Sequence, residues 1–243
     1  LVSDRAYDRL FDRLETLEDA FDLSTETSPT QRVGGQPVEQ LETVEHVGPM
    51  LSIDSSGTET DVRDFDDRVR ERLASADYAG PVQYLCEPKF DGLSIELVYE
   101  DGVLQRAATR GDGKRGDDVT ENVRTIRSVP LELRGDYPSF LAVRGEVFMP
   151  KDAFQAYNRE RIERGEDPLS NPRNAAAVTL RQLDPSVTAE RPLDCFVFEV
   201  LDEEECGFET RLEEHRAVDR WGFQIDDHTE RVDDIDDAVA DEV

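Results

Sequence analysis

The sequence predicts an α+β fold with a mostly antiparallel sheet, and three observations support that prediction. Apolar residues in two segments of the first 73 residues recur at steps of three and four, which is typical of amphipathic helices. The middle of the chain changes to strand-like segments in which side chains alternate with a period of two. Between two of these segments, Glu100-Asp101-Gly102 is a turn sequence short enough to join antiparallel neighbours.

The N-terminal part is predicted to hold two helices separated by a connector. The first helix is predicted over roughly the first twenty residues, and its apolar stripe consists of Tyr7, Leu10, Phe11, Leu14, Leu17 and Phe21. Residues 28–49 contain three prolines and several glycines, which predicts a connector leading to a short strand at residues 50–53. A second amphipathic helix is predicted over residues 61–73. The connector indicates two bodies, residues 1–45 and residues 46–243.

The rest of the chain is predicted to alternate between strands and helices. Strands are expected at residues 82–87, 93–99, 103–108, 141–149 and 195–201. Helices are expected at residues 150–164, 171–183 and 210–221, and from residue 235 onward. Pro150 suits the start of its helix, because the missing N–H would have no partner in the first turn.

The charge balance is strongly acidic. Lys and Arg number 28 against 57 Asp and Glu, which gives a formal net charge of −29. Only Lys89, Lys114 and Lys151 are lysines, and such a lysine-poor, carboxylate-rich composition is typical of proteins from salt-loving organisms, where screening acts over about 3 Å. In such salt a local arginine cluster could still hold phosphate. The chain has no apolar run of the roughly 20 residues that span a bilayer, so no membrane association is expected.

Cysteines and histidines do not form a zinc motif. The three cysteines show no CxxC spacing and the three histidines are scattered, so no zinc site is expected in this chain. The sparse, odd cysteine count without a signal peptide indicates a cytoplasmic protein. The sequence begins without methionine and ends in an acidic, helix-like stretch. We therefore expect a piece of a longer protein.

The segment at residues 86–92 is the first in which residue types conflict with an ordinary strand. Glu87, Lys89 and Asp91 would project to one side, where a surface stripe of ion pairs is the usual explanation. However, Pro88 removes a ladder hydrogen bond, Gly92 follows directly, and one of only three lysines lies between two carboxylates. A lysine can attack an electrophilic phosphorus and form a covalent intermediate. A magnesium ion bound with substrate phosphates would offset the two carboxylates.

Residues 87–92 (EPKFDG) resemble the Lys-x-Asp-Gly nucleophile motif of covalent nucleotidyltransferases, which are the ligases and capping enzymes. Further segments are similar, in the same order, to NAD-dependent DNA ligases: residues 28–34 (SPTQRVG), 109–113 (TRGDG), 122–126 (NVRTI), 143–148 (VRGEVF), 171–176 (NPRNAA) and 180–185 (LRQLDP). The resemblance fades beyond Phe198. It implies a covalent nucleotidyltransferase fold (ATP-grasp-like, adenylation) preceded by a small helical domain.

The resemblance also implies a domain division and a reaction. Residues 1–45 would be the C-terminal part of a small helical NMN-binding domain with its connector, and residues 46–243 an adenylation domain truncated before its last motifs. Lys89 would attack the α-phosphate of NAD, release NMN and become lysyl-AMP. AMP would then pass to the 5′-phosphate of a nick in double-stranded DNA, which the 3′-hydroxyl seals in replication and repair. The enzyme would be a monomer that uses Mg2+, with zinc only in a downstream domain. The isolated chain is not expected to seal nicks.

The resemblance assigns the residues around the nucleotide. Asp91 would assist Lys89 in catalysis, and Glu146 would face the nucleotide and, indirectly or through phosphate, the metal. The other residues implied to bind the cofactor are Glu87 at the adenine, Arg110 at the nucleotide or its phosphates, Phe198 stacked on adenine, Ser52 and Ile53. The family commonly has tyrosine at the position of Phe198. A core position alternating with Phe196 is an alternative for this residue.

Two further groups of residues are implied to bind substrate. Asp4, Tyr7 and Asp8 would bind the NMN half of NAD from one face of the first helix, although Tyr7 also belongs to the apolar stripe. Arg173 and Arg181 would hold DNA or phosphate from one face of a helix, since eight residues make a little over two turns. The alternative is that both arginines are ordinary surface residues that bind no ligand.

Three other functions remain open at this point. Residues 111–116 read G-x-G-x-x-G, the signature of a dinucleotide-dependent oxidoreductase. This reading is disfavoured because the preceding strand belongs to a hairpin, and because Asp117 and Asp118 would repel a pyrophosphate. An ATP-dependent ligase or capping enzyme would share the lysine motif but not the first helix. A non-catalytic NAD-binding fragment is the third alternative.

Overall fold

The structure is a computed structural model that describes residues 4–23, 27–32, 38–52, 58–202 and 206–240. The chain folds as two compact units. The first comprises Leu1–Met50 and Phe90–Ile225, and the second comprises Leu51–Lys89 and Asp226–Val243. Both combine helices with antiparallel strands, which confirms the predicted α+β class. No helix in the described part of the chain is long and apolar enough to cross a membrane.

The first unit is built on a four-stranded antiparallel sheet with the order β4-β3-β6-β7. Its strands are β3 (Leu93–Glu100), β4 (Val103–Thr109), β6 (Phe140–Phe148) and β7 (Asp194–Val200). The predicted turn between β3 and β4 is confirmed, with Asp101 and Gly102 at φ values of 48° and 82°. Turns with positive φ match the twist of paired strands, which explains why an Asp-Gly pair stands here.

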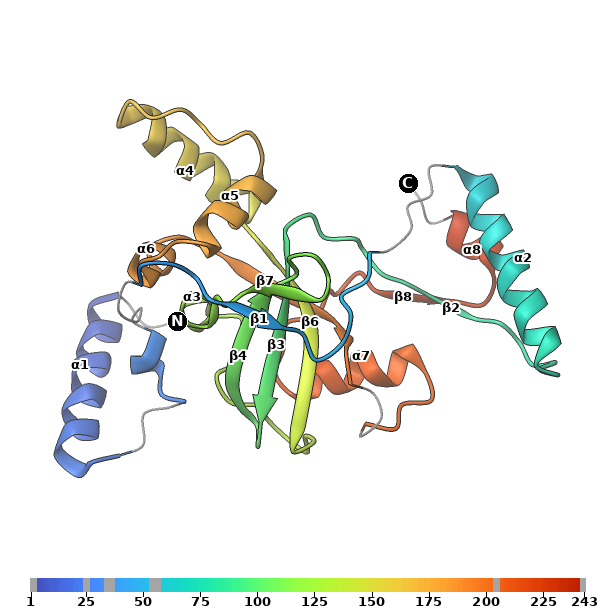
Figure 1. Ribbon diagram of the computed structural model, residues 1–243, viewed down its shortest axis with the longest axis horizontal. Helices are drawn as coiled ribbons and strands as arrows, with labels where there is room; N and C mark the ends of the chain where they lie inside the picture. The colour runs from blue at the N-terminus through green and yellow to red at the C-terminus, as the bar shows by residue number, and fades with distance from the viewer. Residues whose placement is uncertain (1–3, 24–26, 33–37, 53–57, 203–205, 241–243) are drawn as a thin grey trace. The chain divides into compact units, whose positions relative to one another are not determined.

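One face of this sheet carries the hydrophobic core. Ile95, Leu97, Val143 and Val147 are buried there and pack with Trp221, directly after α7 (Arg211–Arg220). Figure 1 shows α7 behind the sheet, and it contacts β7. Because side chains alternate along a strand, the residues between these core positions project from the opposite face.

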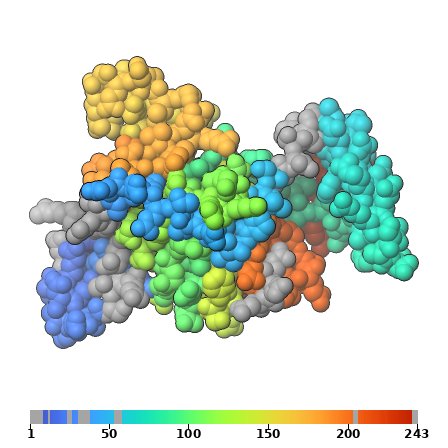
Figure 2. All heavy atoms as spheres, viewed as in Figure 1, coloured from blue at the N-terminus to red at the C-terminus, as the bar shows by residue number. Residues whose placement is uncertain are grey.

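The connector crosses this opposite face and forms a small sheet that the sequence did not predict. β1 (Thr43–Glu45) pairs antiparallel with β5 (Arg115–Asp117), and Figure 2 shows the blue connector lying against the green segment that contains β5. The predicted strand at residues 50–53 is wrong for residues 50–52, and residue 53 lies outside the described residues. Met50 is instead buried beside the β4–β5 turn, where its N–H donates to the Gly113 carbonyl, 2.9 Å away.

The helices predicted for the first unit are present as α1 (Asp4–Phe21), α4 (Lys151–Glu163), α5 (Pro172–Leu180) and α7. The 3-10 turn η1 (Pro29–Arg32) and the short helices α3 (Thr120–Arg124) and α6 (Pro185–Ala189) were not predicted. The helix predicted over residues 171–183 ends at Leu180 as α5. The Asp184 side chain accepts the Ser186 N–H and so caps a new helix, α6, which explains the break.

The second unit pairs two short strands from distant parts of the chain. β2 (Tyr84–Cys86) lies antiparallel to β8 (Glu230–Val232), and α2 (Glu59–Ser75) packs with α8 (Ile235–Ala240). The Tyr84 hydroxyl donates to the Asp66 carboxylate, which Arg70 also contacts at 2.8 Å. Burial, and then this hydrogen bond, raise the pKa of Tyr84 to about 12. The hydrogen bonds from Arg70 and Tyr84 lower the pKa of Asp66.

Candidate functional site

Polar and aromatic side chains gather on the sheet face opposite the core. We call this surface the polar face, and it consists of Ser94, Glu96, Arg106, Arg110, Arg144, Glu146, Phe148, Phe196 and Phe198. Strand pairing aligns Ser94 with Glu146 and Glu146 with Phe196, so these three side chains stand in a row across the sheet.

The second half of the lysine motif docks onto this face. The Gly92 N–H donates to Oε1 of Glu146, 3.1 Å away. A Cβ added to Gly92 would lie only 2.1 Å from the Val147 carbonyl oxygen, so no other residue fits here without displacing backbone. The ring of Phe90 stacks on Phe196 with centroids 4.1 Å apart. These contacts fix the backbone around Asp91 beside Glu146.

Two of the predicted residues, Asp91 and Arg173, form an ion pair. Nη1 of Arg173, in the first turn of α5, lies 3.4 Å from Oδ1 of Asp91. The Asn171 side chain caps this turn by accepting the Asn174 N–H, which sets where α5 begins. The two side chains are 56% and 76% exposed, so their pairing contributes at most about 1 kcal/mol to stability. Both groups remain available to a phosphate or a reacting amine.

Arg110 and Glu146 flank the same residue from opposite sides. The Arg110 N–H donates to the Ser94 carbonyl at 2.9 Å, and Ser94 pairs with Glu146 on the other neighbouring strand. The backbones of Arg110 and Glu146 are therefore two strand spacings apart, about 10 Å. A cationic and an anionic side chain thus bracket a strip of sheet about as long as a nucleotide.

Phe198 lies half-buried under an arginine that the sequence analysis did not single out. The Arg144 guanidinium lies 5.4 Å from the centre of the Phe198 ring, within the range of a cation–π contact. Arg144 is 6% exposed, donates from Nε to the Ser94 hydroxyl at 3.0 Å and lies 3.3 Å from Glu199. Strand alternation could have found it, since Arg144 and Glu146 share a face in the segment VRGEVF.

The other predicted residues either lie in the second unit or have side chains that the structure does not describe. Glu87 and Lys89 are exposed and follow β2 in the second unit, so the lysine motif spans the point where the chain passes between units. Ser52 is also exposed there, while Ile53 lies outside the described residues. The structure places the backbone of the NMN-binding candidates within α1 but does not describe their side chains; they are Asp4, Tyr7 and Asp8.

Arg181 departs from its predicted setting. It is the C-cap residue of α5 rather than part of the helix, and its Nη2 lies 2.6 Å from Oδ2 of Asp117. Arg173 stands at the other end of α5, about 12 Å away along the axis. The two arginines therefore mark the two ends of a short helix, each beside an aspartate.

The G-x-G-x-x-G segment is a hairpin turn between β4 and β5. Gly111 and Gly113 have φ values of 53° and 89°, and the Asp112 carboxylate accepts the N–H groups of Lys114 and Arg115. These hydrogen bonds lower the pKa of Asp112. Because the turn directs these backbone donors at its own carboxylate, they are not offered to a pyrophosphate. The antiparallel strands around it also differ from the parallel sheet of an oxidoreductase.

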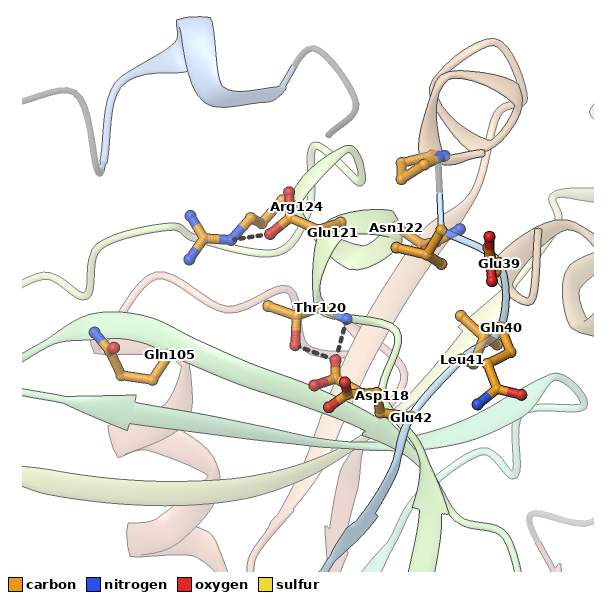
Figure 3. Close-up of a pocket in the computed structure, with 12 residues that line it drawn as sticks. Glu39, Gln40, Leu41, Glu42, Gln105, Asp118, Thr120, Glu121, Asn122 and Arg124 are labelled. Atoms are coloured by element: carbon orange, nitrogen blue, oxygen red, sulfur yellow. Dashed lines mark hydrogen bonds and ion pairs between the residues drawn. The ribbon is translucent and has the colours of Figure 1, made fainter. Parts of the chain in front are cut away.

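A pocket of about 620 Å³ lies beside the connector rather than at the predicted residues (Figure 3). Its charged lining consists of Glu39, Glu42, Asp118, Glu121 and Arg124. In Figure 3 the arginine is paired with Glu121, at 3.5 Å, and Asp118 accepts from Thr120. Four carboxylates against one arginine do not suit a phosphate ligand.

The described residues include no group of three or more metal-binding side chains. Mg2+, however, is commonly held by one or two carboxylates together with substrate phosphates. Glu146 is half-buried on the polar face and has the donor type that Mg2+ requires. The residues present therefore fit a magnesium ion that arrives with a phosphate-bearing substrate.

Comparison with known proteins identifies both parts of the chain. Residues 38–242 match the model of the NAD-dependent DNA ligase adenylation domain, and residues 1–34 match a DNA ligase-like, N-terminal NAD+-binding domain. Similar proteins named DNA ligase occur in Natronomonas pharaonis, 75% identical over 99% of this chain, and Haloarcula marismortui, 65% identical over 98%. A third, from Salinibacter ruber, is 48% identical over 99%. The chain spans 34–35% of the length of these relatives.

Proposed function

The chain belongs to the NAD-dependent DNA ligase family, and we propose that it carries out the first step of that reaction, the transfer of AMP from NAD to Lys89. The unprotonated Nζ of Lys89 attacks the α-phosphorus, a P–N bond forms as the nitrogen gives up a proton to solvent, and the bond from that phosphorus to the bridging oxygen breaks. NMN leaves with the bonding electron pair, and lysyl-AMP remains. The observation that carries this proposal is the docking of Gly92 on Glu146, because it fixes Asp91 beside a second carboxylate.

The groups proposed for the transfer come from the polar face, from α5, and from the segments around the lysine motif and residue 52. Negative charge on the phosphates calls for cationic partners, and Arg110 and Arg173 are the proposed ones. Phe198 offers an aromatic surface to adenine, with Arg144 holding its ring from the sheet. Glu87 is proposed to read the adenine, with Ser52 and Ile53 in the same nucleotide-binding set. Asp91 is proposed to orient the lysine.

Glu146 is the residue proposed to hold Mg2+, directly or through a phosphate oxygen. The ion, when bound, would neutralise developing charge on the phosphates. Glu146 itself is anchored by the Gly92 N–H, so its carboxylate keeps a fixed position relative to the Asp91 backbone. This arrangement links the metal-binding candidate to the lysine motif through a single hydrogen bond.

The remaining elements follow from the domain division. We propose residues 1–45 as part of the NMN-binding domain and connector, with Asp4, Tyr7 and Asp8 binding NMN, and residues 46–243 as adenylation domain. Nicked double-stranded DNA is the proposed second substrate, with Arg173 and Arg181 on its phosphates. We further propose that the complete enzyme is a cytoplasmic monomer that serves DNA replication and repair.

Intact mass spectrometry tests the proposal. The chain, and a version extended to the full length of the relatives, are incubated with NAD or ATP and Mg2+ in high salt. We expect an adduct with the added mass of AMP from NAD but not from ATP, and its loss in Lys89→Ala. Lys151→Ala, in α4, is the matched control and keeps the adduct. Binding of NAD without an adduct in either version would instead establish a non-catalytic NAD-binding module.

A further inference from the structure

A buried histidine joins the connector to the backbone of Arg110. His46 directly follows β1, and its side chain is 1% exposed. Its Nε2 lies 3.0 Å from the Arg110 carbonyl oxygen. A carbonyl oxygen can only accept a hydrogen bond, so Nε2 must carry the proton that it donates.

The other side of the ring faces a carboxylate that is itself held in place. Oε2 of Glu96, a residue that is 0% exposed, lies 3.4 Å from Nδ1 of His46 and accepts from Arg106 at 3.0 Å. Oε1 of Glu96 accepts the Val47 N–H at 2.7 Å. A buried carboxylate is costly unless it is paired and hydrogen-bonded, and here both oxygens have partners. Nδ1 of His46 has no hydrogen-bond partner among the described residues, so Glu96 lies against the imidazole without a hydrogen bond to it.

Both peptide groups next to the Arg110 Cα are fixed in this way. Its N–H donates to Ser94, and its carbonyl oxygen accepts from the Gly113 N–H at 2.9 Å as well as from His46. The connector is tied to the same turn a second time, because the His46 N–H donates to the Lys114 carbonyl at 3.0 Å. The direction in which the Arg110 side chain leaves the backbone is thus set partly by the connector.

We propose that His46 is a positioning residue that holds Arg110 for the substrate phosphates, with Glu96 packed against its ring. This inference rests on the proposed contact between Arg110 and the nucleotide. The essential interaction is the hydrogen bond from Nε2 to the Arg110 carbonyl.

Substitution of His46 by glutamine or by asparagine distinguishes the role of Nε2 from that of Nδ1. The side-chain nitrogen of glutamine can take the place of Nε2, whereas that of asparagine reaches only as far as Nδ1. In the full-length enzyme we expect His46→Asn to raise KM for NAD in lysyl-AMP formation about tenfold, the usual effect of losing one well-placed hydrogen bond. The kcat should change less than about threefold, and His46→Gln should restore KM to within about threefold of the parent.

Glu45→Gln is the matched control. Glu45 lies on the same connector and pairs with Arg115 at 2.5 Å, but the pair is exposed, at 73% and 61%. We expect KM for NAD to stay unchanged in this variant. Equal KM values for His46→Gln and His46→Asn, or an equal rise for Glu45→Gln, would overturn the proposal.

Hydrogen exchange on the chain itself gives a readout that does not depend on activity. Amides of residues 110–114 should lose protection in His46→Asn and keep it in His46→Gln. If the parent enzyme forms no lysyl-AMP, the proposed function is wrong, while unchanged protection in His46→Asn would overturn the positioning role by itself.

Discussion

Gly92→Ala tests whether the lysine motif is anchored to the sheet as described. The added Cβ would lie 2.1 Å from the Val147 carbonyl oxygen and 2.9 Å from its carbon. Contacts of this kind need about 3 Å, so the Gly92 backbone and β6 must separate by roughly 1 Å. Leu93, the next residue, pairs with Val147, so the displacement falls on the end of the β3–β6 ladder.

The expected loss is at the upper end of what overpacking costs, about 3 kcal/mol, because the obstructing atom is backbone rather than a flexible side chain. In a chain of this size each kcal/mol lowers Tm by about 2–4 °C, so Gly92→Ala should melt about 6–12 °C below the parent. The Glu146 carboxylate would lose its backbone donor at the same time. We therefore also expect the yield of lysyl-AMP to fall at temperatures where the variant is still folded.

Differential scanning calorimetry in high salt measures the first effect, and Gly48→Ala provides the control. A Cβ on Gly48 would meet its nearest atom, the Leu201 carbonyl oxygen, at 3.5 Å, an ordinary contact. That variant should therefore melt within about 2 °C of the parent. If Gly92→Ala melts together with Gly48→Ala and forms the adduct normally, the close approach of Gly92 to β6 is not a feature of the folded protein.

Raising KCl from about 0.1 M to 1 M shortens the Debye length from about 10 Å to 3 Å. Because this screens the repulsion within a chain of net charge −29, Tm should rise by several degrees. An equal rise in an uncharged osmolyte would contradict this electrostatic origin. Because the pKa of Tyr84 is raised to about 12, its contribution to stability is complete below pH 10 and disappears as pH rises toward 12. In Tyr84→Phe, the absorbance titration at 295 nm should lack one late-titrating phenolate. The decline in stability at alkaline pH should be absent from this variant as well. The lowered pKa of Asp66 acts in the opposite direction, stabilising above its ordinary titration range and losing that contribution as pH falls; Asp66→Asn should flatten the acid limb of a urea-unfolding series. Arg144→Lys should cost about 1–2 kcal/mol in chemical denaturation, since one ammonium cannot both donate to Ser94 and cover Phe198; an unchanged midpoint would show that the guanidinium contacts are dispensable.

Local signals in the sequence predicted the elements that depend on local chemistry. The Asp-Gly turn predicted the β3–β4 hairpin correctly, because these residues adopt positive φ at a low cost in free energy. Thr210 caps α7 through the Glu213 N–H, and the predicted helix at residues 210–221 is confirmed almost residue for residue. The strand predicted at residues 141–149 is likewise confirmed as β6, in which side chains alternate between the core and the polar face.

Local signals could not predict which distant segments pair with each other. β1 and β5 are three residues each, too short for a period to be recognised, and their partners lie some seventy positions apart in the sequence. β2 and β8 are separated by most of the chain, so nothing local indicates that Cys86 lies opposite Glu230. For the same reason the role of His46 could not be read from the sequence, because its two partners, Glu96 and Arg110, are brought to it only by the crossing of the connector.

The burial of charged residues in this sheet is not explained by packing of the hydrophobic core. Glu96 and Arg144 are almost fully buried, and a face that served packing only would be more stable with apolar residues of similar volume. Their charges are satisfied by hydroxyl, backbone and arginine partners. Two of these buried groups also contact residues proposed to meet the nucleotide, since the Ser94 carbonyl accepts the Arg110 N–H and the Arg144 guanidinium lies over Phe198. Buried charge in this sheet is therefore best explained as the framework that holds the exposed side chains in the direction of the proposed nucleotide site.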